Sequence, residues 1–190
     1  MPNWCNNGIT ISHKDPAMID RVIKGQEGLL MEFIPTPKEL VETVAGFMGE
    51  DKRAAHEAQQ AANIAKYGYK DWYDWNVANW GTKWDFSLEN VDRVDEHTVK
   101  AAFDSAWAPP TEAYAKLCAM GFEIEAYYNE PGMGFVGKWV GDEEDYFDDY
   151  YEYDGYNSET VREAIGAELD DYFNISESMA EWEEENAEEE

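Results

Sequence analysis

Basic side chains are scarce in this sequence: 14 Lys and Arg residues stand against 42 Asp and Glu residues among 190, which gives a formal net charge of −28. Proteins that bind DNA or RNA irrespective of sequence rely on Lys and Arg to displace counterions from the phosphates. Docking to an anionic membrane surface also requires clustered basic residues. The charge therefore excludes direct nucleic-acid binding of this kind and argues against anionic membranes as partners.

Long apolar runs are absent as well. No stretch approaches the ~20 apolar residues that a membrane-spanning helix needs. The opening residues 1–7 have neither the basic segment nor the apolar segment of a signal peptide. We therefore expect no membrane partner and a cytoplasmic location in the cell that makes the protein.

Cysteine and histidine are too few and too scattered for a recognisable metal site. Cys5 and Cys118 form no Cys-x-x-Cys pair, which argues against structural zinc. We expect two reduced, buried thiols, with a disulfide as the alternative. His13, His56 and His97 have no helical i,i+4 partner and no His-Glu-x-x-His motif. We expect no metal and no cofactor, although clustered carboxylates leave a weak divalent-cation site as an alternative.

Catalytic motifs are also missing. No serine stands in a nucleophile elbow. The Gly-x-Gly-x-x-Gly pattern at residues 132–137 lies between two strand patterns, whereas a dinucleotide site needs it at the start of a helix. We expect no catalytic residues and no enzymatic activity. An enzyme is the third alternative, and it would need a pocket with a perturbed histidine or carboxylate.

Apolar patterns of strand and helix follow one another in a regular order. Ile9 and Ile11 alternate with polar residues, Asp15-Pro16 provides a helix N-cap with proline at N1, and Gly25 ends that helix. Strands are predicted at residues 3–13, 29–34, 99–107, 122–128 and 135–140, and helices at 16–24 and 111–120. This order predicts an α+β fold, namely a ferredoxin-like split βαβ sandwich with an antiparallel sheet and helices on one face.

An inserted helical segment at about residues 38–96 interrupts this order, within a domain predicted to span residues 1–141. Residues 50–66 have a helical pattern with alanines along one stripe, at positions 54, 58, 61 and 65. Four tryptophans follow between Trp72 and Trp84, Gly81 marks a helix end, and alternation over 84–88 predicts a short strand. We favour the interpretation that these tryptophans form a core that packs the insertion against the sheet. The alternative, a stacking platform for bases, would need a basic groove that the local charges do not provide.

The composition changes after Gly141. Residues 142–190 contain 21 acidic residues and one basic residue, Arg162, with five tyrosines in residues 146–156. Apolar residues recur at every fourth position from Val161 to Phe173, which predicts a helix over residues 158–173. We expect its apolar stripe to pack on the protein itself, with packing on a partner as the alternative. Residues 181–190 are mostly glutamate, and we expect a frayed end there.

Four blocks of the sequence resemble the YubB-type ferredoxin-like family of bacteriophage and conjugative-plasmid proteins. The blocks are residues 1–7, residues 79–85 with the sequence NWGTKWD, residues 106–110 with the sequence AWAPP, and residues 128–137 with the pattern Y-x-E-x-G-x-x-F-x-G. The resemblance covers roughly residues 1–140 and implies a ferredoxin-like fold and a mobile-element origin. It implies no established activity and no catalytic residues, and residues 142–190 depart from the shared pattern.

The acidic extension is the strongest functional signal in the sequence. On one face of a strand, carboxylates at i and i+2 lie about 6.5–7 Å apart, which is close to the spacing of successive phosphates. Glu159, Glu163 and Asp170 fall on or near one side of the predicted helix. Such rows on a folded support would match a basic channel in charge, and tyrosines supply contact area typical of binding hot spots.

The sequence therefore predicts a phage- or plasmid-encoded inhibitor that binds a host nucleic-acid-recognising defence protein through an acidic, nucleic-acid-mimicking surface. The partner would be a host protein with a basic nucleic-acid-binding site, occluded without any chemistry. The alternative is a non-catalytic structural or regulatory interaction module with a solubilising acidic tail. The oligomeric state stays open. The residues predicted to bind the partner are Asp142, Glu143, Glu144, Asp145, Asp148, Asp149, Tyr150, Tyr151, Glu152, Tyr153 and Asp154.

Overall fold

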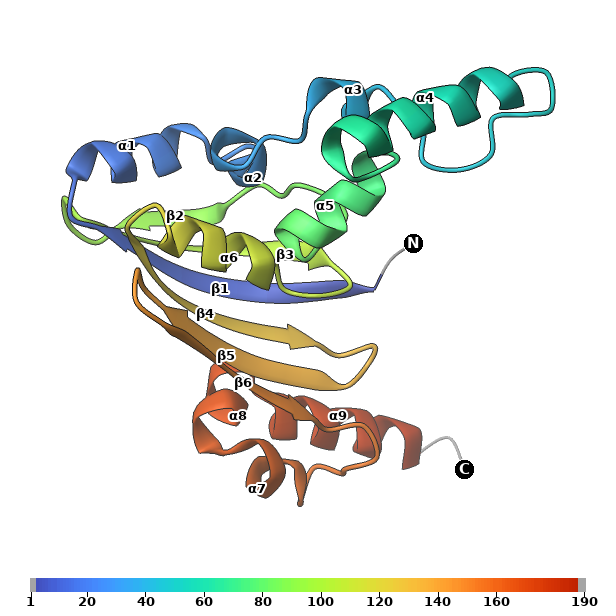
Figure 1. Cartoon of the computed structure of the whole chain (residues 1–190). Coiled ribbons are helices and arrows are strands. Elements are labelled where there is room, and N and C mark those ends of the chain that lie inside the picture. Colours follow the sequence, from blue (N-terminus) through green and yellow to red (C-terminus); the bar gives the residue numbers. More distant parts are fainter. Residues whose placement is uncertain (1–2, 188–190) are drawn as a thin grey trace.

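The computed structural model of the chain describes residues 3–187, which form one six-stranded antiparallel sheet with helices against both faces (Figure 1). The strands lie side by side in the order β2-β3-β1-β4-β5-β6. Their bounds are Trp4–His13 for β1, Glu89–Arg93 for β2, Thr98–Ala106 for β3, Phe122–Glu130 for β4, Phe135–Gly141 for β5 and Tyr146–Glu152 for β6.

The first four strands and two helices make the ferredoxin-like unit that the sequence predicts. Helix α1 (Pro16–Lys24) follows β1, and helix α6 (Thr111–Cys118) connects β3 to β4. Strand β3 lies between β1 and β2, and every neighbouring pair is antiparallel, which is the split βαβ arrangement. Strands β5 and β6 extend this unit beyond β4 by two successive hairpins. The prediction of the fold class is confirmed.

Helix α1 forms where its local signals place it. The Asp15 carboxylate accepts a hydrogen bond from Ala17 N at 3.0 Å, and Pro16 needs no hydrogen bond at the first helical position. The helix buries Ile19 and Val22 against the sheet and ends at Gly25. The predicted boundaries of this helix are confirmed.

The strand predicted at residues 29–34 is wrong, because this segment is helix α2 (Leu29–Phe33). The Asp85 carboxylate accepts hydrogen bonds from Leu30 N at 2.9 Å and from Met31 N at 2.8 Å. It thereby caps the first turn of α2 from a position more than fifty residues away in the sequence. The second strand of the ferredoxin-like unit is instead β2, which lies within the range predicted as insertion.

Three further helices fill the segment between α2 and β2: α3 (Lys38–Val41), α4 (Arg53–Tyr67) and α5 (Trp72–Trp80). Helix α4 projects away from the sheet (Figure 1), and its alanine stripe is exposed rather than packed. The short strand predicted at 84–88 is also wrong, because Asp85 is engaged in capping and β2 begins only at Glu89. Asn90 has a positive φ of 51°, and the register of β2 shifts beside it.

The main core lies between the sheet and the layer formed by α1, α2, α5 and α6 (Figure 1). Trp80 at the end of α5 is 2% exposed and donates a hydrogen bond from its indole to Ile34 O, so it does join the insertion to the sheet layer. Trp84, in contrast, is 41% exposed, so the predicted tryptophan core holds only in part. Cys5 and Cys118 are buried free thiols.

A second, smaller core lies on the opposite face of the sheet. Helices α7 (Val161–Ile165), α8 (Ala167–Phe173) and α9 (Ile175–Ala187) pack beneath β5 and β6 (Figure 1). Val136 of β5 joins the apolar stripe of α7 and α8 in this core, so the prediction that the stripe packs on the protein itself is confirmed. Tyr172 stacks on Tyr127 with ring centroids 4.2 Å apart. A side chain at Gly8 would collide with the hydroxyl of Tyr172.

The C-terminal helix differs from the prediction in two respects. Gly166, with φ 85° and ψ 153°, interrupts the helix expected over residues 158–173 and separates α7 from α8. Helix α9 continues to Ala187, where a frayed end was expected from Glu181 onward. Residues 188–190 of that expected end lie outside the described residues.

Candidate functional site: the acidic surface

The turn between β5 and β6 holds the first group of predicted partner-binding residues in a fixed shape. The Asp142 carboxylate accepts hydrogen bonds from Glu144 N at 2.7 Å and from Asp145 N at 3.2 Å, and Asp142 N donates to Asp145 O at 3.0 Å. The two backbone donors hold the pKa of Asp142 below its usual value. This carboxylate is therefore ionised at neutral pH, and Glu143 and Glu144 are exposed at the tip of the turn.

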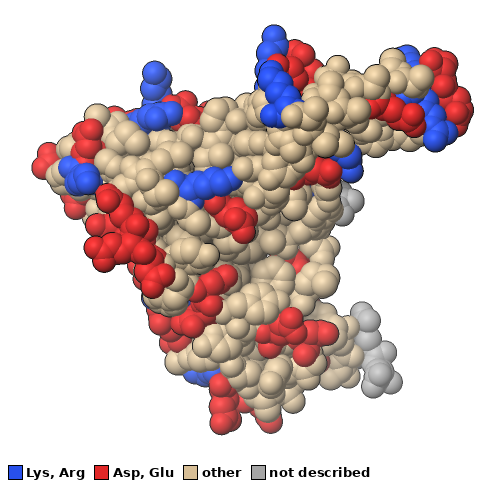
Figure 2. Space-filling model, viewed as in Figure 1, with Lys and Arg blue, Asp and Glu red and all other residues tan. Residues whose placement is uncertain are grey.

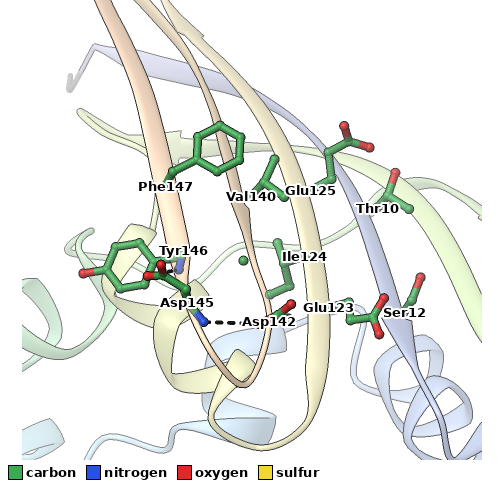
Figure 3. Close-up of a pocket in the computed structure, with 11 residues that line it drawn as sticks. Thr10, Ser12, Glu123, Ile124, Glu125, Val140, Asp142, Asp145, Tyr146 and Phe147 are labelled. Carbon is green, nitrogen blue, oxygen red and sulfur yellow. Dashed lines mark hydrogen bonds between the residues drawn. The ribbon is translucent and has the colours of Figure 1, made fainter.

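An open hollow of about 570 Å³ lies beside this turn, near the ends of β1 and β5 and the beginnings of β4 and β6 (Figure 3). We call it the acidic hollow. Four carboxylates line it, together with the hydroxyls of Thr10 and Ser12. Thr10 is in register with Glu125, and Ser12 with Glu123, so the two strands present hydroxyl and carboxylate side by side. The carboxylates come from Glu123, Glu125, Asp142 and Asp145.

Glu123 and Glu125 belong to this surface although the sequence analysis did not include them. Phe122, Ile124 and Ala126 of β4 are buried in the main core. Because successive side chains of a strand point to opposite faces, the two glutamates must point to the other face of the sheet. The alternation in the sequence was the signal that could have found them.

Strand β6 carries the second group of predicted residues, and their arrangement differs from the expected row of carboxylates. Asp148 and Asp149 are neighbours in the strand and lie on opposite faces. Asp148 lies on the main-core face and accepts a hydrogen bond from the Tyr128 hydroxyl. The next residue of β6 on that face is Tyr150, which is not an acid. Burial outweighs this hydrogen bond and raises the pKa of Asp148, with the nearby Asp149 adding to the effect. The expected i,i+2 spacing of carboxylates is therefore not formed on β6.

Packing within the chain accounts for several of the clustered tyrosines. Tyr146 stacks on the buried Trp139 with ring centroids 5.3 Å apart, and Tyr150 lies against Phe135 at 5.5 Å. Tyr153 is 7% exposed in the second core, and its hydroxyl donates to Asn129 Oδ1 at 2.8 Å. Tyr153 is therefore the one predicted partner-binding residue whose side chain is buried in this fold.

The other ten predicted partner-binding residues are exposed on the surface. They fall into the β5–β6 turn, strand β6, and the position just beyond it. We refer to these residues together with those of the acidic hollow as the acidic surface. The ten exposed residues are Asp142, Glu143, Glu144, Asp145, Asp148, Asp149, Tyr150, Tyr151, Glu152 and Asp154.

The helices of the second core contribute less acid than the sequence suggested. Glu159 and Glu163 are exposed, but Asp170 is only 2% exposed. Its carboxylate accepts hydrogen bonds from Ser176 N and Ser176 Oγ, each at 2.7 Å, and from Arg162. Asp170 is thus a structural cap of α9 rather than part of a binding surface.

Both cations of the C-terminal half are held by pairs of carboxylates. Lys138 Nζ lies 2.9 Å from Glu125 and 2.7 Å from Glu168, and Arg162 is paired with Asp170 and Asp171. Burial by itself lowers the pKa of Lys138, but hydrogen bonds to Glu168, Tyr127 and Glu125 outweigh it and raise the pKa. Neither cation therefore interrupts the negative potential of this half of the molecule.

The separation of charge is visible on the surface of the molecule. Figure 2 shows most Lys and Arg side chains over the upper helical layer, where acidic side chains also lie, whereas the charged side chains in the lower part of the same face, over β5, β6 and the last helices, are mainly Asp and Glu. Within residues 3–187, no group of three or more His, Cys, Asp or Glu side chains is placed to hold a metal ion. No helix in the described part of the chain is long and apolar enough to cross a membrane.

Comparisons with known proteins concern the domain that carries this surface. A family model described as "Ferredoxin-like domain in Api92-like protein" matches residues 79–189. Among solved structures, the chain is similar to the protein Api92 from Yersinia pseudotuberculosis, with 16% identity, a TM-score of 0.48, and coverage of 80% of this chain and 98% of that chain. The comparison with curated proteins gives no match. The family match includes residues 142–189, the greater part of the acidic extension.

Proposed function

The chain belongs to the family of Api92-like proteins with a ferredoxin-like domain, and on that premise we propose that it is an inhibitor that binds a host nucleic-acid-recognising protein through its acidic surface. The inhibitor acts in the cytoplasm of a bacterial host, by occlusion and without catalysis. Its encoding by a bacteriophage or plasmid is part of the proposal and is supported by the sequence blocks that resemble the YubB-type family.

The observation that carries the proposal is the unbroken negative charge of one half of a rigid fold. Residues 122–190 contain 24 acidic and two basic residues, and both basic residues are neutralised by carboxylate pairs. The carboxylates of the acidic hollow and of the β5–β6 turn belong to paired strands of the sheet or to the turn between two of them, and this pairing fixes their relative positions. A pre-organised anionic surface binds a cationic groove with a smaller loss of side-chain freedom than a mobile tail would.

The surface supports mimicry of the potential of a nucleic acid rather than of its phosphate ladder. The carboxylates come from strands β4 and β6, the β5–β6 turn and the position after β6, and they do not repeat at one fixed spacing. Complementary potentials of this kind accelerate encounter and disfavour partners of the wrong charge. Because contacts between exposed charges are screened over about 8–10 Å at physiological ionic strength, the affinity should fall as salt rises.

Reversal of four exposed acids tests the proposal. We expect the variant with Glu143, Glu144, Asp149 and Glu152 all replaced by Lys to bind its partner at least ~100-fold more weakly, a loss of about 2.7 kcal/mol, because attraction becomes repulsion. The partner is a protein retained by the immobilised wild-type chain from bacterial extract, and its affinity is then measured by calorimetry at several salt concentrations.

A matched control separates the acidic surface from net charge alone. Replacing Glu27, Asp51, Glu89 and Asp92 by Lys changes the net charge equally, and these four acids are exposed, away from the acidic surface. Unchanged affinity in the first variant, or an equal loss in both, would contradict the proposal. So would a retained partner that does not release DNA or RNA when the chain is added.

A second candidate function rests on an exposed aromatic patch formed by Trp4, Trp84 and Trp107, which are 45%, 41% and 44% exposed. Lys83 Nζ lies between two of these rings, 3.9 Å from the centroid of Trp84 and 3.8 Å from that of Trp107. Trp107 has a φ of 72°, a strained conformation for a bulky residue. This patch favours the alternative of a non-catalytic interaction module, in which the acidic part only confers solubility.

If the chain is such an interaction module, removal of the aromatic patch should weaken partner binding more than reversal of the acidic surface does. Replacing Trp84 and Trp107 by Ala should weaken partner binding by about 2 kcal/mol or more, because exposed tryptophans are frequent hot spots of interfaces. The loss should change little between low and high salt, which a titration across salt concentrations measures. Replacement of the 43%-exposed Met120 by Ala is the control and should have no effect. A loss restricted to low salt would argue against this module.

A further inference from the structure

A groove of about 640 Å³ lies between the β4–β5 turn, the segment after β6, and helices α8 and α9. We call it the C-terminal groove. It is separate from the acidic hollow, with which it shares no lining residue. Six of its lining residues carry the argument: Asn6, Asp154, Tyr156, Phe173, Trp182 and Glu183.

The groove has aromatic walls that are left open to solvent. Trp182 of α9 is 65% exposed and Tyr156 is 46% exposed, whereas Phe173 is half-buried against the second core. Rings of this size are normally covered on at least one face, and they stack well on planar groups. Together they provide flat apolar surface for a planar ligand group.

The charged side chains that line the groove, Asp154 and Glu183, are both carboxylates. The Asp154 carboxylate has no hydrogen bond and no ion pair with any residue of 3–187. The Glu183 carboxylate is fixed by Ser158 N at 3.0 Å and Ser158 Oγ at 2.6 Å, which leaves acceptor capacity on both oxygens. The side-chain amide nitrogen of Asn6 donates a hydrogen bond to Asp104 Oδ1, which leaves the side-chain oxygen of Asn6 as an acceptor. No Lys or Arg lines the groove among the described residues.

We propose that the C-terminal groove binds an arginine side chain of the basic protein partner, an inference that rests on the proposed function. A guanidinium group is planar, stacks on aromatic rings, and donates paired hydrogen bonds to a carboxylate. A guanidinium group therefore matches both kinds of group that line the groove, the rings of Trp182 and Tyr156 and the carboxylate of Asp154. An anionic ligand would meet two carboxylates, and an apolar ligand would leave both of them without a partner.

The position of the groove gives this arginine a particular role. Asp154 lies two residues beyond Glu152, the last residue of β6, so the groove continues the acidic surface at its end. Hot spots of interfaces are aromatic and arginine anchors in a pocket, surrounded by contacts that exclude water. The groove supplies the anchor, and the acidic surface supplies the long-range attraction.

A short peptide tests the groove without the partner. We expect acetyl-Gly-Arg-Gly-amide to shift the indole N–H signal of Trp182 in NMR spectra of the full chain, and to bind at least about fivefold more tightly than its citrulline counterpart, which lacks the charge. Trp182→Phe assigns the signal. Trp182→Ala and Asp154→Asn should each weaken peptide binding at least about fivefold. Both positions are exposed, so the folded spectrum of each variant can be checked directly.

Controls on other exposed residues make the outcome specific. Phe47→Ala and Asp51→Asn, on exposed residues that lie outside the groove and outside the acidic surface, should leave peptide binding unchanged. Equal binding of the arginine and citrulline peptides, or equal losses in groove and control variants, would overturn the inference. If the peptide binds in the groove but the four-Lys variant still binds its partner normally, the groove stands and the proposed function fails.

Discussion

Replacing Trp139 by Ala is expected to lower the free energy of unfolding by about 3–5 kcal/mol. Trp139 of β5 is fully buried, with Tyr114 of α6 on one side and Tyr146 of β6 on another, each with a ring centroid 5.3 Å away. Its ring also occupies the space where a side chain at Gly141 would lie. The substitution therefore leaves a cavity between three elements that cannot close without moving the β5–β6 hairpin.

Urea unfolding followed by circular dichroism measures this loss, and an exposed tryptophan provides the control. Trp182→Ala removes the same side chain at a site that is 65% exposed, and we expect a change of less than about 1 kcal/mol. Because domains of this kind have total stabilities of about 5–15 kcal/mol, a loss of this size removes a large fraction of the stability and shifts the urea midpoint clearly. A loss equal to that of the control would mean that Trp139 is not packed as described.

Replacing Asp170 by Ala is the second large effect, with an expected loss of about 3–5 kcal/mol in the unit formed by α7 to α9. The Asp170 side chain is 2% exposed, and it joins Arg162 of α7 to Ser176 in the first turn of α9. Its removal leaves the partly buried N–H of Ser176 without its acceptor and removes an anion from a helix N-terminus. Amide hydrogen exchange of residues 175–187 should rise strongly in this variant.

Asp171 is a close control for this prediction. Its carboxylate also pairs with Arg162, but the side chain is 66% exposed. Exposed ion pairs contribute about 0–1 kcal/mol, so Asp171→Ala should leave the exchange of α9 nearly unchanged. Equal effects of the two substitutions would show that the Arg162 pairing, and not the cap on Ser176, holds α9 in place.

The same carboxylate gives the C-terminal unit a defined response to acid. Burial would raise the pKa of Asp170, but the hydrogen bonds from Ser176 and the charge of Arg162 outweigh burial and hold the pKa below its usual value. Its contribution to stability is therefore present above about pH 4, the usual range of an aspartate, and is lost as the pH falls through the lowered value. Asp170→Asn should flatten this part of the pH profile.

Local signals in the sequence were sufficient for most of the ferredoxin-like unit. The cap at Asp15, the proline after it and Gly25 define α1 by contacts within a few residues, so they could be recognised without a structure. The alternation in β1, β3 and β4 likewise reflects one buried face. These elements depend on neighbours in the chain, and the prediction of the fold followed from them.

The errors occurred where a distant residue decides the local structure. The apolar run from Leu29 to Ile34 fits a strand or a buried helix equally well, and Asp85 caps it as a helix. The acids of β6 depend on register, which places Asp148 and Asp149 on opposite faces. Tyr153 illustrates the same limit, because an aromatic residue in an acidic stretch is buried once α7 to α9 fold beneath the sheet. Composition identified the acidic region, but only the pairing of β5 with β6 shows which side chains share a face.

Strand β6 is an outer strand of the sheet, and all seven of its residues are exposed. Outer strands of this kind invite another chain to add a strand, and charged side chains are a common protection against such polymerisation. Even when no partner is bound, the acids of β6 therefore disfavour the pairing of this outer strand with a strand of another copy of the chain. Burial raises the pKa of Asp148, so this acid of β6 takes up a proton, and its share of the protection is lost, as the pH falls through that raised value.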